Sequence, residues 1–147
     1  MKSLIAILSA AIVTVLGWVG AAPAIANEYS SPAPAGAEAY IISPEDGAEV
    51  SSPFTVRFGL SGMGVAPAGI DKPKTGHHHL LVDLETLPDL DEALAATDHI
   101  KHFGGGQTQT TLDLPAGTHK LQLLLGNYVH IPHEPPVMSE PITVLVK

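Results

Sequence analysis

The stretch FTVRFGL, residues 54–60, alternates large apolar side chains with polar or small ones along its whole length. This two-residue period predicts a β-strand with one buried face. The stretches HKLQLLL (119–125) and PITVLVK (141–147) show the same period, and turn sequences such as SPEDG and LPAG separate the runs. Only residues 88–96, PDLDEALAA, are suited to a helical turn or two. The pattern indicates an all-β fold, an antiparallel immunoglobulin-like β-sandwich of about seven strands.

Six strands can be placed on the sequence from this period. They are expected at residues 39–43, 54–60, 78–84, 107–114, 118–125 and 142–146. Residues 85–106 would hold a further short strand or a helical turn. In immunoglobulin notation these strands are A, B, C, E, F and G, and the B–C, D–E and F–G loops meet at one end of the sandwich, because strand direction alternates.

The N-terminus has the pattern of an export signal. Lys2 supplies a positive charge, residues 3–19 are almost wholly apolar, and Ala24-Ile25-Ala26 is a small-x-small cleavage motif. The alternative is an uncleaved membrane anchor, because the apolar run approaches the roughly 20 residues of a membrane span. In both cases the domain is expected outside the cytoplasm: in the periplasm, secreted, or in a thylakoid lumen.

The expected organisation has three parts. They are a cleaved signal peptide (1–26), a disordered spacer rich in Pro and Ala (27–39) and the sandwich domain (40–147).

The charge and the cysteine content of the chain limit the classes of molecule or ion that it is expected to bind. The chain has a formal net charge of −8, only seven Lys and Arg residues that do not cluster, and no cysteine. Nucleic acid is therefore not an expected partner, and a membrane is expected only if the signal segment stays uncleaved. Without cysteine, a metal ion would bind through nitrogen, oxygen or thioether sulfur. No nucleophile motif is present, so no catalytic residue is assigned.

All eight histidines lie between residues 77 and 133. In TGHHHLLVDL (75–84), His77 and His79 are on one strand face, where both imidazoles can reach a single ion. His130 and His133 follow in a proline-stiffened loop expected at the same end of the sandwich, and His102 precedes strand E there. These five histidines are the candidate metal ligands. A thioether from a methionine would favour copper, whereas an all-imidazole site with an open position would suit zinc.

Structural roles are the competing interpretation for several of these residues. His78 is on the face of Leu80 and is expected to pack in the core. His119 is expected to bond a turn or strand edge. Met63 and Met138 are expected to fill gaps. His99 could meet His102 if the intervening turn were helical.

Five linked motifs resemble a family. FGLSGMGVAPAG, TGHHHLLVD, HFGGGQTQT, LPAGTHKLQLLLGN and HIPHEPPVMSEPITV are similar, in that order, to a bacterial secreted family with a domain of unknown function. The resemblance covers residues 41–146. It implies an exported, single-domain, immunoglobulin-like protein whose histidine motifs are the family's signature, and it implies no activity. The family usually has an acidic residue where Gln109 stands and Asp where Asn127 and Glu134 stand.

Three functions follow from the sequence, in this order. The first is an exported protein that binds copper or zinc through the histidine cluster at the loop end. The second is a non-catalytic module that recognises an envelope protein or glycan, in which the histidines are structural. The third is a metal-dependent enzyme, which would need a metal-bound water because no protein nucleophile is evident.

Overall fold

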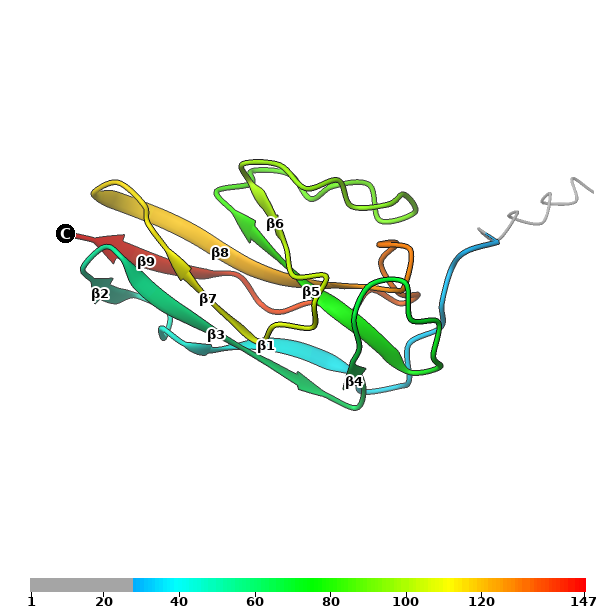
Figure 1. Cartoon of the computed structure of the whole chain (residues 1–147). Helices are drawn as coiled ribbons and strands as arrows, with labels where there is room; N and C mark the ends of the chain where they lie inside the picture. Colours follow the sequence, from blue (N-terminus) through cyan, green and yellow to red (C-terminus); the bar gives the residue numbers. More distant parts are fainter. Residues whose placement is uncertain (1–27) are drawn as a thin grey trace, which may run out of the picture.

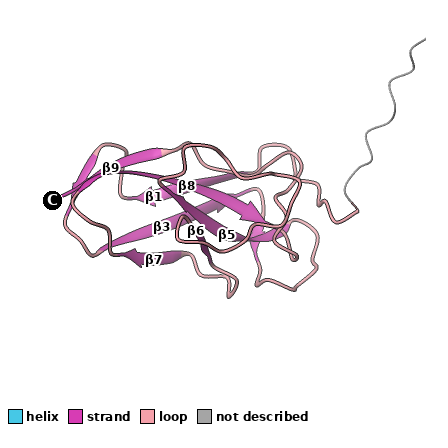
Figure 2. Cartoon of the chain, turned by 90° about the horizontal axis from the view of Figure 1, so that it is seen from above, coloured by secondary structure: helices cyan, strands magenta, loops and turns pink. Residues whose placement is uncertain are grey.

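The protein, described over residues 28–147 by a computed structural model, consists of two β-sheets packed face to face (Figure 1). The described residues contain no helix, so none of them spans a membrane as a helix (Figure 2). The predicted signal peptide lies outside the described residues. The strands are β1 (Glu38–Ser43), β2 (Ala48–Val50), β3 (Phe54–Ser61), β4 (Gly64–Val65), β5 (Thr75–Val82), β6 (Ile100–His102), β7 (Gln109–Leu112), β8 (Gly117–Gly126) and β9 (Ile142–Val146). The all-β prediction is confirmed.

The strand order is that of an immunoglobulin-like sandwich. One sheet has the order β1-β3-β7, which corresponds to strands A, B and E. The other has the order β2-β9-β8-β5-β4, in which β9, β8 and β5 correspond to G, F and C, and β6 adds to β5. All pairs are antiparallel except β2 with β9 and β4 with β5. The nine strands exceed the expected seven because β2 and β4 are short edge additions of three and two residues.

The main core lies between the two sheets. It is built from the apolar faces predicted by the two-residue period, including Phe58 of β3, Leu80 of β5, Leu123 of β8 and Val144 of β9. These four side chains are at most 3% exposed. Burial of this kind contributes about 25 cal/mol for each Å² of apolar surface, so the alternating strands both define the sheets and hold them together.

The outer face of the larger sheet is covered as well. Residues 83–99 leave β5, turn back over it and place Leu94 and Ile100 against Leu81 of β5 and Leu124 of β8. The helical turn expected at 88–96 does not form there, because Leu94 N–H is bonded to the carbonyl oxygen of His130 rather than to a helical neighbour. This cover buries β5 on both faces, so every residue from Gly76 to Val82 is buried.

The limits of β5 differ from the prediction of 78–84. The strand begins three residues earlier, at Thr75, where Thr75 and Gly76 pair with β4. It ends at Val82, because Asp83 has a left-handed backbone with φ 55°. The histidine triplet therefore lies within the strand rather than at its entry. β7 is shorter than the expected 107–114, and β9 matches its prediction.

The N-terminal segment contacts the loop end of the sandwich. Asn127 Nδ2 donates to the carbonyl oxygen of Tyr29 and to Ser31 Oγ, and Ala33 N–H donates to the carbonyl oxygen of Glu134. Ala33 also packs against the main core. Composition alone does not predict these contacts, since this segment has the Pro- and Ala-rich sequence of a spacer.

Candidate metal centre

Alternation along β5 directs neighbouring histidines to opposite faces. His78 points into the core, where its ring centroid lies 5.3 Å from that of Phe58. His77 and His79 point to the covered outer face, and their ring centroids are 4.8 Å apart. The predicted division of the triplet is confirmed, and a His-x-His pair faces the space beneath the 83–99 cover.

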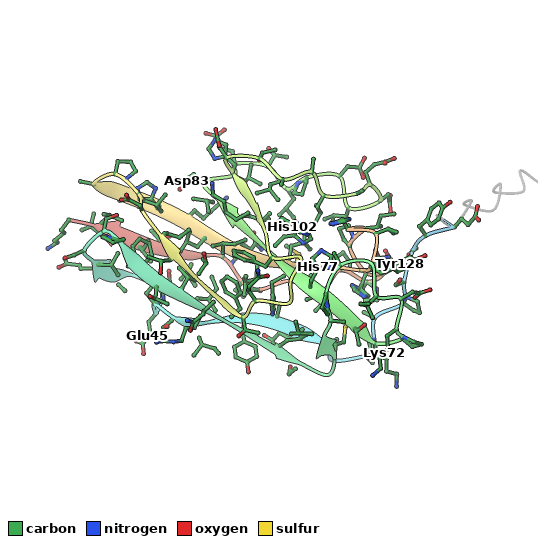
Figure 3. All side chains as sticks on the ribbon, in the orientation of Figure 1. Glu45, Lys72, His77, Asp83, His102 and Tyr128 are labelled. Atoms are coloured by element: carbon green, nitrogen blue, oxygen red, sulfur yellow. The ribbon has the colours of Figure 1, made fainter. Side chains whose placement is uncertain are left out.

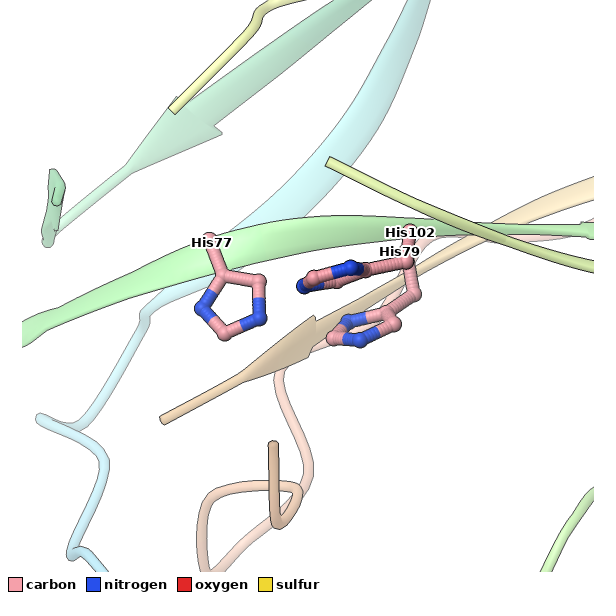
Figure 4. A group of neighbouring side chains, drawn as sticks. All are labelled: His77, His79 and His102. Carbon is pink, nitrogen blue, oxygen red and sulfur yellow. The ribbon is translucent and has the colours of Figure 1, made fainter. Parts of the chain in front are cut away.

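Two further histidines reach this space from separate segments. His102 of β6 is paired directly with His79 across the strands, and its ring lies 5.1 Å from the rings of both His77 and His79. The ring of His130, in the loop after β8, lies 5.0 Å from His77 and 4.8 Å from His102. Nitrogens of His77, His79 and His102 lie within 4.8 Å of one another, so these three could hold a metal ion (Figure 4).

Asn127 organises the turn that carries His130. Its side-chain oxygen accepts the N–H groups of Val129 and Ile131, and its carbonyl oxygen accepts the N–H of His130. His130 is thereby held at φ 73°, a left-handed conformation that a non-glycine residue adopts at a cost. Such strain is characteristic of functional sites, and here it accompanies the approach of His130 to the other rings.

Two glycines leave room for the imidazoles. A Cβ on Gly126, the β8 residue paired with His77, would lie 2.7 Å from Cε1 of His79. A Cβ on Gly104 would lie 2.4 Å from Cε1 of His102. Neither glycine has a positive φ, so space for a ring, rather than backbone freedom, explains both. This role of the two glycines could not be predicted from the sequence, because no spacing rule links the GGG and LGN stretches to a histidine.

Burial keeps the inner histidines neutral. Desolvation, followed by the neighbouring imidazoles, lowers the pKa of His77 to about 4 and that of His79 to about 3. Both ring nitrogens of each residue are buried without a hydrogen-bond partner among the described residues. Buried nitrogens are nearly always partnered. Neutral imidazoles with free nitrogens are the form that binds a metal ion. His102 is exposed to solvent, and Figure 3 shows it beside His77 in the domain.

Not all the candidate ligands meet here. The structure brings together His77, His79, His102 and His130. His133 is not among them, and its Nε2 lies 3.1 Å from the carbonyl oxygen of Thr75, within hydrogen-bond distance. The methionines lie elsewhere too, since Met63 packs against the main core and Met138 against the outer apolar cluster.

His99 does not join His102. The intervening residues are extended in β6 rather than helical, and Nδ1 of His99 lies 2.8 Å from the carbonyl oxygen of Val82.

His119 has the structural role expected of it. Its Nδ1 lies 2.7 Å from Asp83 Oδ2 and its Nε2 lies 2.9 Å from the carbonyl oxygen of Pro115. Both partners are acceptors, so the doubly protonated ring satisfies both, and the hydrogen bond to Asp83 raises the pKa of His119 above 6.5. The protonated ring ties the end of β5 to β8.

This pair predicts how stability depends on pH. Because the folded-state pKa of His119 is raised, its contribution is complete below the unfolded-state pKa of about 6.5 and is lost as pH rises through the folded-state value. The melting temperature of the wild type should therefore exceed that of His119→Gln most at pH 6, and the difference should shrink by pH 9. Thermal unfolding followed by circular dichroism measures it. A difference that stays constant with pH would show that the ring is neutral.

Comparison with known proteins identifies a family. The model of the family described as "Domain of unknown function (DUF4399)" matches residues 56–147. No curated protein matches the chain. Among solved structures, the endo-beta-1,4-mannanase from Thermotoga petrophila is 23% identical with a TM-score of 0.43, over 76% of this chain and 20% of the mannanase chain. The matched region is thus about a fifth of that enzyme, and this likeness carries no argument about function.

Proposed function

The chain belongs to the DUF4399 family of domains of unknown function, and we propose that it is an exported protein that binds one divalent transition-metal ion through its histidine cluster. The proposed ligands are His77, His79, His102 and His130. The observation that carries the proposal is the convergence of these four rings from β5, β6 and the loop after β8, with neighbouring ring centroids 4.8 to 6.1 Å apart. Export is inferred from the N-terminal sequence.

The ligand set favours copper or zinc. Four imidazoles offer only nitrogen, which suits Zn(II) and Cu(II) and does not suit Mg(II) or Ca(II), whose ligands are oxygens. Cu(II) stands above Zn(II) in affinity for nitrogen ligands, so we expect Cu(II) to bind more tightly. Because the site lies on strands and a strained turn, its rings are positioned before the ion arrives, which limits the entropic cost of binding.

Calorimetric titration tests the proposal. The metal-free mature protein, residues 27–147, is titrated separately with Cu(II), Zn(II) and Mg(II). The expected result is one ion per chain for Cu(II) and Zn(II), with Cu(II) tighter, and no binding of Mg(II). Weak binding of several ions per chain, or none, would contradict it and would favour the recognition module for an envelope protein or glycan.

A single glycine substitution should weaken the site without unfolding the domain. Gly104→Ala adds a methyl group where Cε1 of His102 now lies. Because His102 is exposed, its ring can swing away at little cost in stability, and the ion would lose one ligand. We expect about a tenfold loss of Cu(II) affinity, the loss typical when the support of one metal ligand is removed. Calorimetry and thermal unfolding measure the two effects.

Gly64→Ala is the matched control. Its Cβ would meet only Thr75 Cγ2, at 3.5 Å, which is an ordinary contact. Equal affinities for the two variants would show that His102 is not a ligand.

A further inference from the structure

His133, which the metal site leaves unused, lines a second cavity. This cavity has a volume of about 430 Å³ and forms where residues 30–34 cross the loop of residues 70–75, beside Asn127 and Tyr128. Small-molecule sites in proteins have volumes of about 300 to 1,000 Å³. Since residues from three separate segments line it, the fold itself builds this cavity.

One part of the wall is apolar and stiff. Pro32 and Pro34 come from the N-terminal segment, and Ile70, Pro73 and Tyr128 add apolar surface from the other segments. Ile70 is 51% exposed, a large apolar surface that a ligand would cover. The prolines have few conformations to lose, and the backbone bond from Ala33 to Glu134 fixes their segment against the domain. This wall is therefore largely formed before a ligand binds.

Another part of the wall is cationic. Lys72 and Lys74, two of only seven basic residues in a chain of net charge −8, both line the cavity. Neither forms an ion pair with a described residue. Asp71 is the one acidic side chain in the described lining, so the lining carries a net positive charge.

Hydrogen bonds fix the backbone from which these exposed lysine side chains extend. The carbonyl oxygen of Lys74 accepts the N–H of Gly64, and that of Lys72 accepts Thr75 Oγ1. Lys74 itself has φ 60°, a strained left-handed conformation. The two cationic side chains thus start from fixed positions beside an apolar wall.

We propose that this cavity binds a small organic anion. Its apolar body would lie against the prolines, Ile70 and Tyr128, and its acid group would pair with Lys72 and Lys74. Charge-assisted hydrogen bonds to an ammonium group are stronger than neutral ones, so the acid group would set the specificity. The site is separate from the four-histidine cluster and does not depend on a metal ion.

Two fluorescent probes with one ring system test the proposal. The probe 8-anilino-1-naphthalenesulfonate is an apolar anion, and N-phenyl-1-naphthylamine has the same rings without the sulfonate. We expect the anionic probe to bind the mature protein at one site and at least about tenfold more tightly than the neutral probe. In Lys72→Gln/Lys74→Gln this preference should disappear, whereas in the control Lys120→Gln/Lys147→Gln it should remain.

The outcomes separate this site from the metal centre. Retention of the anionic probe by His77→Gln/His79→Gln supports a separate site, and its loss there would overturn that separation. Equal binding of both probes, unchanged by the lysine variant, would overturn the assignment of an anion. Absence of binding by either probe would overturn the site itself. A competing carboxylate such as hexanoate should displace the anionic probe, and hexan-1-ol should not.

Discussion

Replacing His77 and His79 together by glutamine is expected to lower the affinity for Cu(II) and Zn(II) by at least about a hundredfold. Loss of a group that merely supports a ligand already costs about 10- to 100-fold, and this variant removes two ligands. These two also form the buried floor of the site, with 0% exposure each. His102 and His130 would remain as two partly or fully exposed imidazoles, which hold an ion weakly. Competitive calorimetric titration measures the loss.

The matched control is His99→Gln/His133→Gln. Each of these histidines has a ring nitrogen close to a backbone carbonyl oxygen, that of Val82 for His99 and that of Thr75 for His133. Glutamine can donate to the same oxygen, so the fold should tolerate the change. We expect the affinity of this control to stay within about threefold of wild type. A large loss in the control, with little loss in the first variant, would mean that the ion binds elsewhere.

Replacing His78 by leucine is expected to stabilise the protein. His78 is 0% exposed in the core, and neither of its ring nitrogens has a hydrogen-bond partner among the described residues. A buried polar group without a partner costs about 1 to 3 kcal/mol, and leucine of similar size removes that cost. We expect a gain of this size in the free energy of unfolding at pH 7, measured by urea denaturation.

The gain should grow in acid. Burial lowers the pKa of His78 to about 4, so between about pH 6.5 and pH 4 the unfolded chain binds a proton that the folded chain does not. That difference destabilises the wild type as pH falls, and leucine abolishes it at this position. Metal affinity should be unchanged, because His78 faces the other side of β5. A loss of stability at both pH 7 and pH 5 would show that His78 has a partner in the core.

The sequence was sufficient to predict the sandwich and the orientation of the triplet. Both depend on local alternation, which a strand converts directly into faces: Val56 and Leu80 point inward, and His77 and His79 point to the opposite side from His78. The family resemblance is supported by the match over residues 56–147. The bacterial and secreted character that it implies stays a prediction.

Which of the loop histidines joins the cluster depends on long-range packing, which local sequence patterns do not reveal. His130 and His133 are three residues apart in one loop, and no periodicity distinguishes them. His130, and not His133, reaches the other rings because its backbone is left-handed and because hydrogen bonds to Asn127 shape its turn. Asn127 in turn donates hydrogen bonds to Tyr29 and Ser31. Similarly, PDLDEALAA has a pattern suited to a helical turn, but its leucines are used to cover β5 in an irregular path.

Anomalous X-ray diffraction from crystals of the metal-loaded mature protein tests whether four histidines from three segments form one metal site. Data collected on both sides of the copper or zinc absorption edge locate the ion without reference to the protein atoms. The expected result is one peak at about 2.0 to 2.1 Å from nitrogens of His77, His79 and His102, with His130 completing the site. A peak beside other residues, or a protein saturated with metal in solution that gives no peak at the cluster, would show that these four histidines do not form a metal site.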